Sequence, residues 1–319
     1  MKTFFKIKNL AAALFIAVAC LSCNDDDASG PSESLLDLAQ QDPSLTTFVQ
    51  AVQRAEITGN LEGNQTFTIL APHNTAFNEF FIQNGYSGID AVPVDVLKQL
   101  LYNHMISAEF KAEDFLIGYI STNATGTAST TNRVALFIDT ISGIKFNGNS
   151  TLVTPNIDAR NGVLHIVNRV IKVPTVYDHL LANPALSAFT NALAQSQGSG
   201  FVATLSGTTE SPFTVLAPQN TAFTAFLDET NHDALSEIPA EELASLLNYH
   251  IITDENILSS GFFQNQVLTA RNGQNINITL TGGGKKATDV NNRVSNIIFT
   301  DIQASNGIVH VLDKVLMPN

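Results

Sequence analysis

The sequence predicts an α+β fold in which one domain occurs twice along the chain. A motif of eleven residues that begins at Phe67 returns at Phe213 with nine identities, at an offset of 146 residues. Each copy shows helical patterns first and strand patterns later, which is the order of an α+β domain. The 319 residues are 44% hydrophobic, which is enough for two ordinary cores.

Two further motif pairs repeat at almost the same spacing. Leu100-Leu101 with His104 returns as Leu246-Leu247 with His250, and Asn161-Gly162 with His165 returns as Asn306-Gly307 with His310. A period of about 145 residues is far longer than the roughly 20–50 residues of a solenoid repeat. We therefore expect two complete domains, at residues 34–173 and 174–319, that fold as separate units and meet across a small polar interface.

The first helical stretch of each copy is visible from its apolar spacing. In the first copy, Leu45, Phe48, Val49 and Val52 fall at i, i+3, i+4 and i+7, which places them on one helix face. Pro43 lies before them and must separate this helix from a shorter helical turn. The second copy repeats the stretch at residues 176–194.

A short strand follows and ends at the Ala-Pro of the eleven-residue motif. Asn74 and Asn220 come next, where an asparagine caps a following helix. In the first copy that helix turns Phe77, Phe80 and Phe81 toward the core. A second helix then carries the following residues on one face: Val96, Leu97, Leu100, Leu101 and His104.

The last third of each copy is rich in Val, Ile, Thr and Asn, which predicts strands. Gly-containing turns interrupt it, at Asn147-Gly148 in the first copy and at residues 282–284 in the second. Each copy closes with one long strand, at residues 162–173 and 307–317, and this strand carries His165 or His310.

Residues 1–22 have the pattern of a secretory signal peptide, because lysines precede an uncharged apolar run from Leu10 to Leu21. The run is shorter than the roughly 20 residues of a membrane-spanning helix. Leu21-Ser22-Cys23 resembles a bacterial lipobox, and the acidic residues that follow resemble the surface-export signal of Bacteroidetes lipoproteins.

We therefore expect Cys23 to be lipidated, with Cys20 as the competing candidate. Residues 23–33 would form a flexible tether, and the protein would be a surface-exposed lipoprotein of the outer membrane, held to the membrane by its N-terminal lipid. The alternative is an ordinary cleaved signal followed by an incidental cysteine.

Charge and cysteine content exclude several classes of function. Acidic residues outnumber basic ones by 29 to 16, a formal net charge of −13, so we expect no nucleic-acid partner. Both cysteines lie within the first 23 residues. The folded part therefore has no disulfide, no thiol nucleophile and no thiolate metal site.

The repeated residues resemble the motifs of the fasciclin domain. Phe213-Thr-Val-Leu-Ala-Pro-Gln-Asn-Thr-Ala-Phe223 is similar to the first motif of this family, Asn306-Gly307 with His310 to the second, and Leu246-Leu247 with His250 to the tyrosine–histidine motif between them. The three motifs occur in order in both copies, over about residues 34–318. The resemblance implies a β-sandwich or wedge with helices packed on one side, and a role in cell adhesion or matrix binding without catalysis.

The tyrosine–histidine motif differs between the copies. The second copy keeps Tyr249 directly before His250, whereas the first copy has Tyr102-Asn103-His104. If this pair contacts a partner, the resemblance makes the second copy the better candidate.

A second candidate contact is Asp301-Ile302. Animal members of the family carry an integrin-linked Asp-Ile pair at this place, just before the second motif, whereas the first copy has Asn156-Ile157 there. The alternative is that the carboxylate of Asp301 only accepts the amide of a turn.

No arrangement of catalytic or metal-ligating residues accompanies these motifs. The seven histidines all lie more than four residues apart and no Gly-x-Ser-x-Gly motif occurs, so the sequence lacks paired metal ligands and a nucleophile elbow. His104, His165, His250 and His310 recur at matched apolar places, so we interpret them as structural rings that bond backbone groups. We expect neither an enzyme nor a cofactor or metal site.

Two kinds of function remain for the whole chain. One is an adhesion protein that binds an extracellular protein or matrix ligand; the other is a glycan-binding lipoprotein that assists polysaccharide uptake. Sugar sites favour stacked aromatic rings, so the absence of Trp and the presence of five Tyr weaken the second. A passive surface spacer is a third interpretation. Asp139-Thr140-Ile141 also resembles the short acceptor motif of Bacteroidetes O-glycosylation, with an ordinary strand as the alternative.

Overall fold

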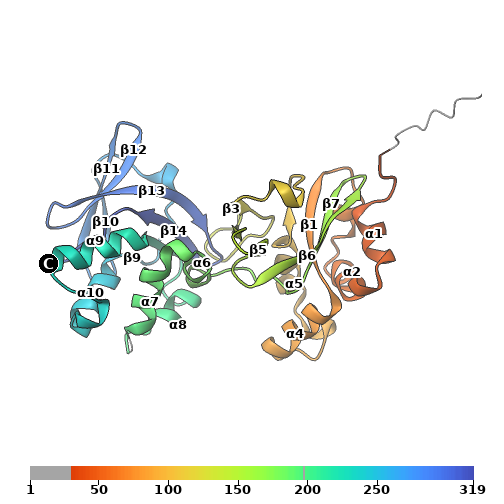
Figure 1. Ribbon diagram of the computed structural model, residues 1–319, viewed down its shortest axis with the longest axis horizontal. Helices are drawn as coiled ribbons and strands as arrows, with labels where there is room; N and C mark the ends of the chain where they lie inside the picture. Colours follow the sequence, from red (N-terminus) through yellow and green to blue (C-terminus); the bar gives the residue numbers. More distant parts are fainter. Residues whose placement is uncertain (1–29, 197) are drawn as a thin grey trace, which may run out of the picture. The chain divides into compact units, whose positions relative to one another are not determined.

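The computed structural model describes residues 30–319, except residue 197. The predicted signal peptide, Cys20, Cys23 and most of the predicted tether lie outside these residues. Pro31–Asn319 forms one compact unit, in which two domains follow each other along the chain (Figure 1). Within the described part of the chain, every helix is too short or too polar to cross a membrane.

The first domain places most of its helices before most of its strands. Its helices are α1 (Leu35–Gln41), α2 (Thr46–Arg54), α3 (Thr58–Glu62), α4 (Asn74–Asn84) and α5 (Val94–Tyr102), with single 3₁₀ turns η1 (Pro43–Leu45), η2 (Ile89–Ala91) and η3 (Ala112–Asp114). Its strands are β1 (Phe67–Pro72), β2 (Met105–Ile106), β3 (Gly118–Ser121), β4 (Ala135–Asp139), β5 (Lys145–Phe146), β6 (Ser150–Ala159) and β7 (Gly162–Val167).

The second domain repeats this order. Its helices are α6 (Val176–Ala182), α7 (Ser187–Gln195), α8 (Phe201–Ser206), α9 (Asn220–Thr230) and α10 (Ala240–Tyr249), with 3₁₀ turns η4 (Pro184–Leu186), η5 (Leu235–Glu237) and η6 (Ser259–Gly261). Its strands are β8 (Phe213–Pro218), β9 (Ile251–Ile252), β10 (Gln266–Thr269), β11 (Asn275–Thr281), β12 (Gly284–Thr288), β13 (Val294–Gln303) and β14 (Gly307–Leu312).

Both domains connect their strands in the same order. The first sheet runs β2-β1-β7-β6-β5-β4-β3 and the second runs β9-β8-β14-β13-β12-β11-β10. At the centre, β1 pairs with β7 and β8 with β14 in parallel, which puts Phe67 opposite Gly162 and Phe213 opposite Gly307. A Cβ on these glycines would lie 1.9 Å and 2.5 Å from the facing carbonyl oxygen. The glycine of the repeated Asn-Gly pair is therefore required by the close approach of two strands.

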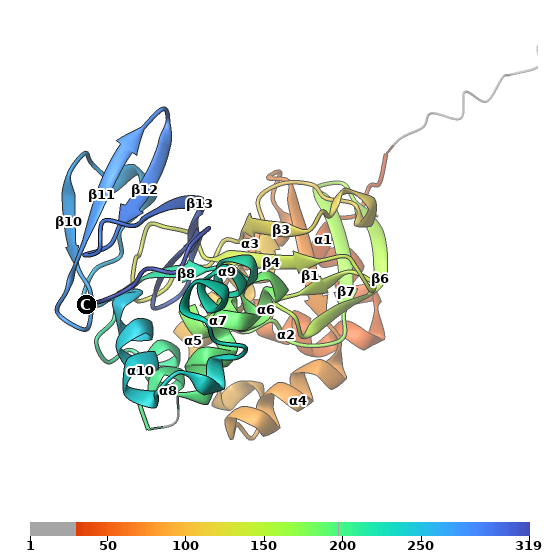
Figure 2. The same cartoon turned by 60° about the vertical axis from the view of Figure 1, so that its left-hand side comes forward.

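The central parallel pair is buried on both faces. Ile69 and Leu164 pack into a core shared with the helices, whereas Leu70 and Val167 pack into a second core with β4 and Phe146. Figure 1 shows α1 and α2 on one side of β1 and β7, and β3 and β5 on the other. The second domain repeats this arrangement, with α7, α9 and α10 on one side and β10 to β12 on the other (Figure 2). The predicted α+β fold, with helices on one side of each domain, is thus confirmed.

The predicted helices agree with the structure except at two positions. One is His104, which is predicted on the second helix but follows the end of α5 at Tyr102. The first stretch breaks at Pro43 into α1 and α2, and the three phenylalanines of α4 are buried. The prediction that Val96 shares the apolar face of Leu97 is wrong, because Val96 is 46% exposed. Adjacent helical residues lie about 100° apart around the axis, so α5 can turn only one of the two fully inward.

The predicted helix caps at Asn74 and Asn220 are wrong in their target. Each asparagine is the first residue of its own helix, and its side chain caps a different one. Oδ1 of Asn74 accepts from the backbone nitrogen of Thr47, and Oδ1 of Asn220 accepts from that of Ala188, both at 2.9 Å. The N-termini of α2 and α7 have no local side-chain cap. A tertiary contact supplies the missing acceptor, which local sequence spacing could not show.

The predicted turns lie where the sequence places them, whereas the predicted closing strands differ in length. The turns at residues 147–148 and 282–283 are confirmed by left-handed backbone, with φ of 47° at Asn147 and 60° at Gly282. Between α7 and β8 the second domain forms α8, the counterpart of α3. The closing strands are shorter than predicted and end at Val167 and Leu312.

Candidate functional site

The predicted ligand residue Asp301 lies at a β-bulge that recurs in both domains. Strands β6 and β13 shift register against their neighbours, and Asn156 and Asp301 occupy the bulges with φ of 58° and 65°. Asn and Asp tolerate this left-handed conformation better than most residues. The carboxylate of Asp301 accepts from the backbone nitrogen and the hydroxyl of Ser259, and Oδ1 of Asn156 accepts from the backbone nitrogen of Ala112 at 2.8 Å. Both side chains therefore cap a 3₁₀ turn, in agreement with the turn-amide alternative.

Asp301 is the exposed member of the four predicted ligand-binding residues. Tyr249 and His250 are 0% exposed, and Ile302 is 1% exposed. These three side chains lie inside the second domain. Of the four predicted residues, only Asp301 is therefore accessible from the surface of the domain.

Tyr249 and Asn103 occupy the same buried position and tie down different segments. The hydroxyl of Tyr249 donates to the carbonyl of Asn275 at 2.6 Å and accepts from the backbone nitrogen of Val290 at 3.1 Å. Burial raises the pKa of Tyr249 to about 12. In the first domain, Nδ2 of Asn103 donates to the carbonyls of Ile171 and the residue after it. The difference between the copies is therefore a difference in internal bonding.

His104 and His250 each join the end of a helix to the segment after the closing strand. Their Nδ1 atoms lie 2.8 Å from the carbonyls of Leu100 and Leu246, and their Nε2 atoms accept from the backbone nitrogens of Ile171 and Leu316. A carbonyl can only accept, so Nδ1 carries the proton in both rings. Burial lowers the pKa of each ring to about 4.

His165 and His310 make a second matched pair of contacts, at the bulges. Nε2 of each ring donates to a loop carbonyl at 2.8 Å, and Nδ1 accepts from the backbone nitrogen of Asn156 or Asp301. Burial lowers the pKa of both rings. The rings thus carry the opposite tautomer to His104 and His250, and they hold the strained bulge in place.

The junction of the two domains centres on Tyr119, which the motif analysis did not identify. Its ring centroid lies 5.6 Å from that of His179 and 5.7 Å from that of Phe299, and its hydroxyl accepts from Nδ2 of Asn183 at 3.2 Å. Burial raises the pKa of the hydroxyl. The junction therefore contains aromatic contacts besides polar ones, such as the hydrogen bond from the backbone nitrogen of Ala128 to the carbonyl of Ser305 at 2.9 Å. No spacing marks Tyr119 as a junction residue, because its partners in the second domain lie at least 60 residues away in sequence.

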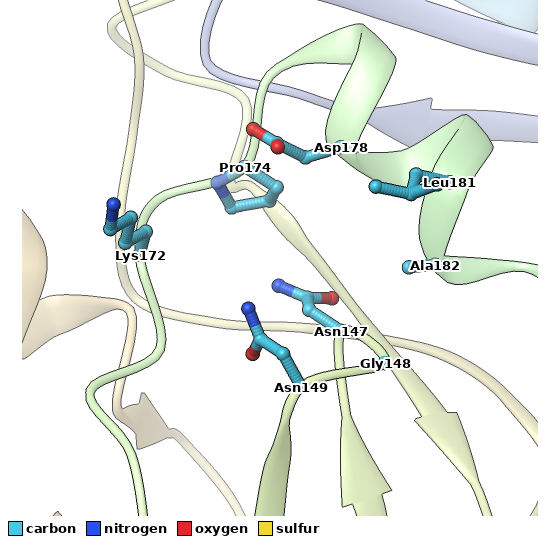
Figure 3. Close-up of a pocket in the computed structure, with 8 residues that line it drawn as sticks. All are labelled: Asn147, Gly148, Asn149, Lys172, Pro174, Asp178, Leu181 and Ala182. Atoms are coloured by element: carbon cyan, nitrogen blue, oxygen red, sulfur yellow. The ribbon is translucent and has the colours of Figure 1, made fainter. Parts of the chain in front are cut away.

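A pocket of about 170 Å³ adjoins this junction (Figure 3). The Asn147-Gly148-Asn149 turn forms one wall, α6 the opposite wall, and Lys172 and Pro174 of the connecting segment close the side. The carboxylate of Asp178 points over the pocket, but it is engaged by the backbone and hydroxyl of Thr175 in the capping box of α6. The eight lining residues include no histidine, cysteine or serine, so the pocket offers neither an imidazole nor a side-chain nucleophile of these types.

Other predicted features occupy unremarkable places in the fold. Thr140 follows the end of β4, where the carboxylate of Asp139 accepts from the backbone nitrogen of Ile141 in a tight turn. Among residues 30–196 and 198–319, no group of three His, Cys, Asp or Glu side chains lies close enough to hold a metal ion.

Comparisons with known proteins find relatives that match most of the chain. Human periostin is 27% identical over 285 residues, which cover 86% of this chain and 31% of periostin. A fasciclin-like arabinogalactan protein of the fungus Arthroderma benhamiae is 24% identical over 279 residues, covering 84% of this chain and 62% of that protein. The chain therefore spans less than two thirds of the length of either relative.

Among solved structures, a FAS1 domain pair from the insect cell adhesion molecule fasciclin I covers 86% of this chain, with a TM-score of 0.49 and 20% identity, and 97% of the insect chain is matched. The family model of the fasciclin domain matches twice, at residues 43–174 and 184–318. These two matches cover most of the chain. The chain therefore belongs to the fasciclin family and carries two of its domains in tandem.

Proposed function

We propose that this chain is a non-catalytic binding protein of the cell surface, which holds an extracellular protein or matrix ligand through its two fasciclin domains. Family membership over both halves of the chain is the observation that carries this proposal. The four matched histidines support it, because both ring nitrogens of each one are bonded to backbone groups. A ring held in this way has no nitrogen left to act as a general base.

The surface beside Asp301 favours a protein ligand. Phe299 lies two residues before Asp301 and is 46% exposed, and it lines one groove of about 330 Å³ with Leu116 and Ile117 of the first domain. Leu116 is 76% exposed. Exposed apolar side chains next to polar groups are typical of protein-binding surfaces. Because Asp301 and Phe299 both belong to the second domain, we expect it to carry the larger share of the binding energy.

Binding of residues 30–319 to an array of extracellular matrix proteins tests this proposal. Asp301→Asn removes the charge and keeps the cap, because Asn156 fills the same role in the first domain. We expect it to weaken binding by about tenfold, while Asp228→Asn on the exposed face of α9 leaves binding unchanged. Equal affinity in all three proteins would remove Asp301 from the contact surface, and the absence of any matrix ligand would contradict the proposed role.

The membrane part of the proposal concerns Cys23. A lipid on this residue would hold the acidic chain at the outer membrane, exposed at the cell surface, since the chain carries no excess of basic groups to bind anionic lipids. Cys23→Ala should release the protein from membranes, whereas Cys20→Ala should not. Mass spectrometry of the mature N-terminus and protease treatment of intact cells check both points, and an unacylated N-terminus would contradict the anchor.

The alternative function is glycan binding in the service of polysaccharide uptake. A pair of equivalent grooves, one in each domain, supports a sugar ligand.

A further inference from the structure

A groove of the same construction occurs in both domains, at the seam where the two edges of each sheet approach each other. In the first domain it lies between the ends of β2 and β3 and encloses about 350 Å³; in the second it lies between the ends of β9 and β10 and encloses about 730 Å³. The backbone nitrogen of Asn123 donates to the carbonyl of Met105 at 2.9 Å, and that of Arg271 donates to the carbonyl of Ile251 at 2.8 Å. Asn123 and Arg271 are therefore equivalent positions, and the two grooves are the same feature of the fold.

Equivalent residues give the two grooves the same floor and the same hydroxyl groups. Ile106 and Ile252 form a buried apolar floor, 3% and 2% exposed. Hydroxyl side chains line the walls at matched positions: Ser107 and Ser121 in the first groove, Thr253 and Thr269 in the second.

A guanidinium group lines each groove, but it comes from a different point of the chain. Arg271 follows β10, whereas Arg133 precedes β4 and is not its equivalent, since Asn123 holds that position. In both domains an asparagine side chain holds the arginine: Nη1 of Arg133 donates to Oδ1 of Asn123, and Nη1 of Arg271 donates to Oδ1 of Asn248 at 2.8 Å. Duplication of the domain does not explain why both grooves contain an arginine, because Arg133 and Arg271 are not equivalent positions. Their shared placement points to a requirement for a positioned guanidinium group.

The second groove shows which group its arginine binds. Both carboxylate oxygens of Glu210 bond to Arg271, with Oε2 2.7 Å from Nε and Oε1 3.0 Å from Nη2. This pairing lowers the pKa of Glu210. In the first groove Arg133 is exposed and, within the part of the chain that the structure describes, forms no ion pair with a carboxylate.

We infer that the first groove binds a uronate sugar carried on an otherwise neutral glycan, and that Glu210 occupies the corresponding place in the second groove. A guanidinium binds a carboxylate through two parallel hydrogen bonds. The exposed hydroxyl of Ser121 matches the hydroxyls of a sugar ring, and half-buried Phe110 offers an apolar surface to its C–H face. A chain with a net charge of −13 repels a polyanion at long range, so an isolated carboxylate fits better than a polyuronate.

The site extends the proposed binding role to a glycan and adjoins the groove lined by Phe299, with which it shares Phe110 and Ile120. The probe is a neutral oligosaccharide that ends in glucuronate, titrated calorimetrically against residues 30–319, with the same oligosaccharide ending in glucose as its control. We expect one glucuronate-ended probe to bind per chain. The glucose-ended control should bind with an affinity at least about tenfold lower. Arg133→Gln should weaken binding by about tenfold or more, and Arg133→Lys should lie between, since lysine keeps the charge without the paired bonds.

Two further variants separate the site from general charge effects. Arg169→Gln removes the same charge from an exposed residue outside the grooves and should bind like the parent chain. Glu210→Gln should release Arg271 and raise the stoichiometry from one probe to two. Melting temperatures show that each variant is folded.

Equal binding of the two probes, or unchanged affinity in folded Arg133→Gln, would overturn the uronate site. A stoichiometry that stays at one in Glu210→Gln would overturn the role of Glu210 as an internal ligand. Binding of matrix proteins without binding of uronate would contradict the uronate site and leave the proposed function standing. Binding of uronate without any matrix ligand would contradict the proposed matrix binding and leave the uronate site standing.

Discussion

His104 and His250 make the same two backbone hydrogen bonds in different domains, 146 residues apart. Each ring donates to the carbonyl four residues before it, at the end of α5 or α10. Each also accepts from the segment that follows the closing strand. The ring therefore links the last helix of its domain to the chain end of that domain, and the neutral form is the one that can make both bonds.

His250→Ala should destabilise the second domain and leave the interior of the first domain unchanged. The substitution leaves two buried backbone groups unpaired, at a cost of roughly 1–3 kcal/mol each. Hydrogen exchange resolved by peptide should show faster exchange in α10 and β14, with α5 and β7 as the internal reference. His232→Ala, at a half-buried position, is the control and should have a small effect. Full stability of His250→Ala would contradict a structural role for the ring.

Acid should destabilise the protein between about pH 6.5 and pH 4. Burial lowers the pKa of His104, His179 and His250 to about 4, against about 6.5 in an unfolded chain. In this window the unfolded state binds more protons than the folded state, so the free energy of unfolding rises with pH, and the stabilisation is fully present above about pH 6.5.

Relative to pH 6.5, each of these rings lowers the free energy of unfolding by on the order of 2–3 kcal/mol at the acid end of that window. Calorimetric unfolding at pH 5 in buffers of different ionisation enthalpy should report an uptake of roughly two to three protons per chain. Unfolding at pH 5 without proton uptake would show that these rings are not buried in the neutral form.

Asp301→Ala should lower the stability of the second domain by roughly 1–3 kcal/mol. The substitution removes the cap of η6 and places alanine at φ of 65°. Asp301→Asn should be close to neutral, because Asn156 makes the matching contact at φ of 58° in the first domain. Chemical denaturation of the three proteins measures the difference, and an alanine variant as stable as the asparagine variant would show that the cap is unimportant.

Tyr119→Ala should loosen the junction of the domains without unfolding either. The ring contacts His179 and Phe299 but is only half-buried, so the cost should be below the roughly 3–5 kcal/mol of a core aromatic. Hydrogen exchange should rise in α6 and stay constant in α4. Tyr119→Phe is the matched control, since it keeps the ring and loses only the bond from Asn183. Equal exchange in α6 of all three proteins would mean that Tyr119 does not hold the junction.

Much of the fold follows from local patterns that the chain repeats. The offset between the motifs indicates two domains, and the i, i+3, i+4 spacing of Phe77, Phe80 and Phe81 gives the buried face of α4, because helix periodicity is a local property. The Asn-Gly pairs mark the start of β7 and β14. The structure adds the reason, which is the close approach of Phe67 to Gly162 across the sheet.

The candidate site could be predicted only in part. Asp301 was identifiable from its motif, and the structure places it at the surface, but its contact with Ser259 joins residues 42 apart. The burial of Tyr249 and Ile302 depends on how α10 and β13 pack within the domain. Motif membership marks positions that a family shares, and it does not separate a surface contact from an internal one.

By itself, the sequence determined the duplication, the α+β class, the apolar helix faces and the turns, because each of these is set by residues close together in the chain. The tertiary structure alone decided that Asn74 caps α2, that Tyr119 lies at the centre of the junction, and that Arg133 and Arg271 reach equivalent grooves from unequal positions. These contacts join segments that are distant in sequence. No periodicity records such a contact, because it depends on the three-dimensional path of the backbone between the partners.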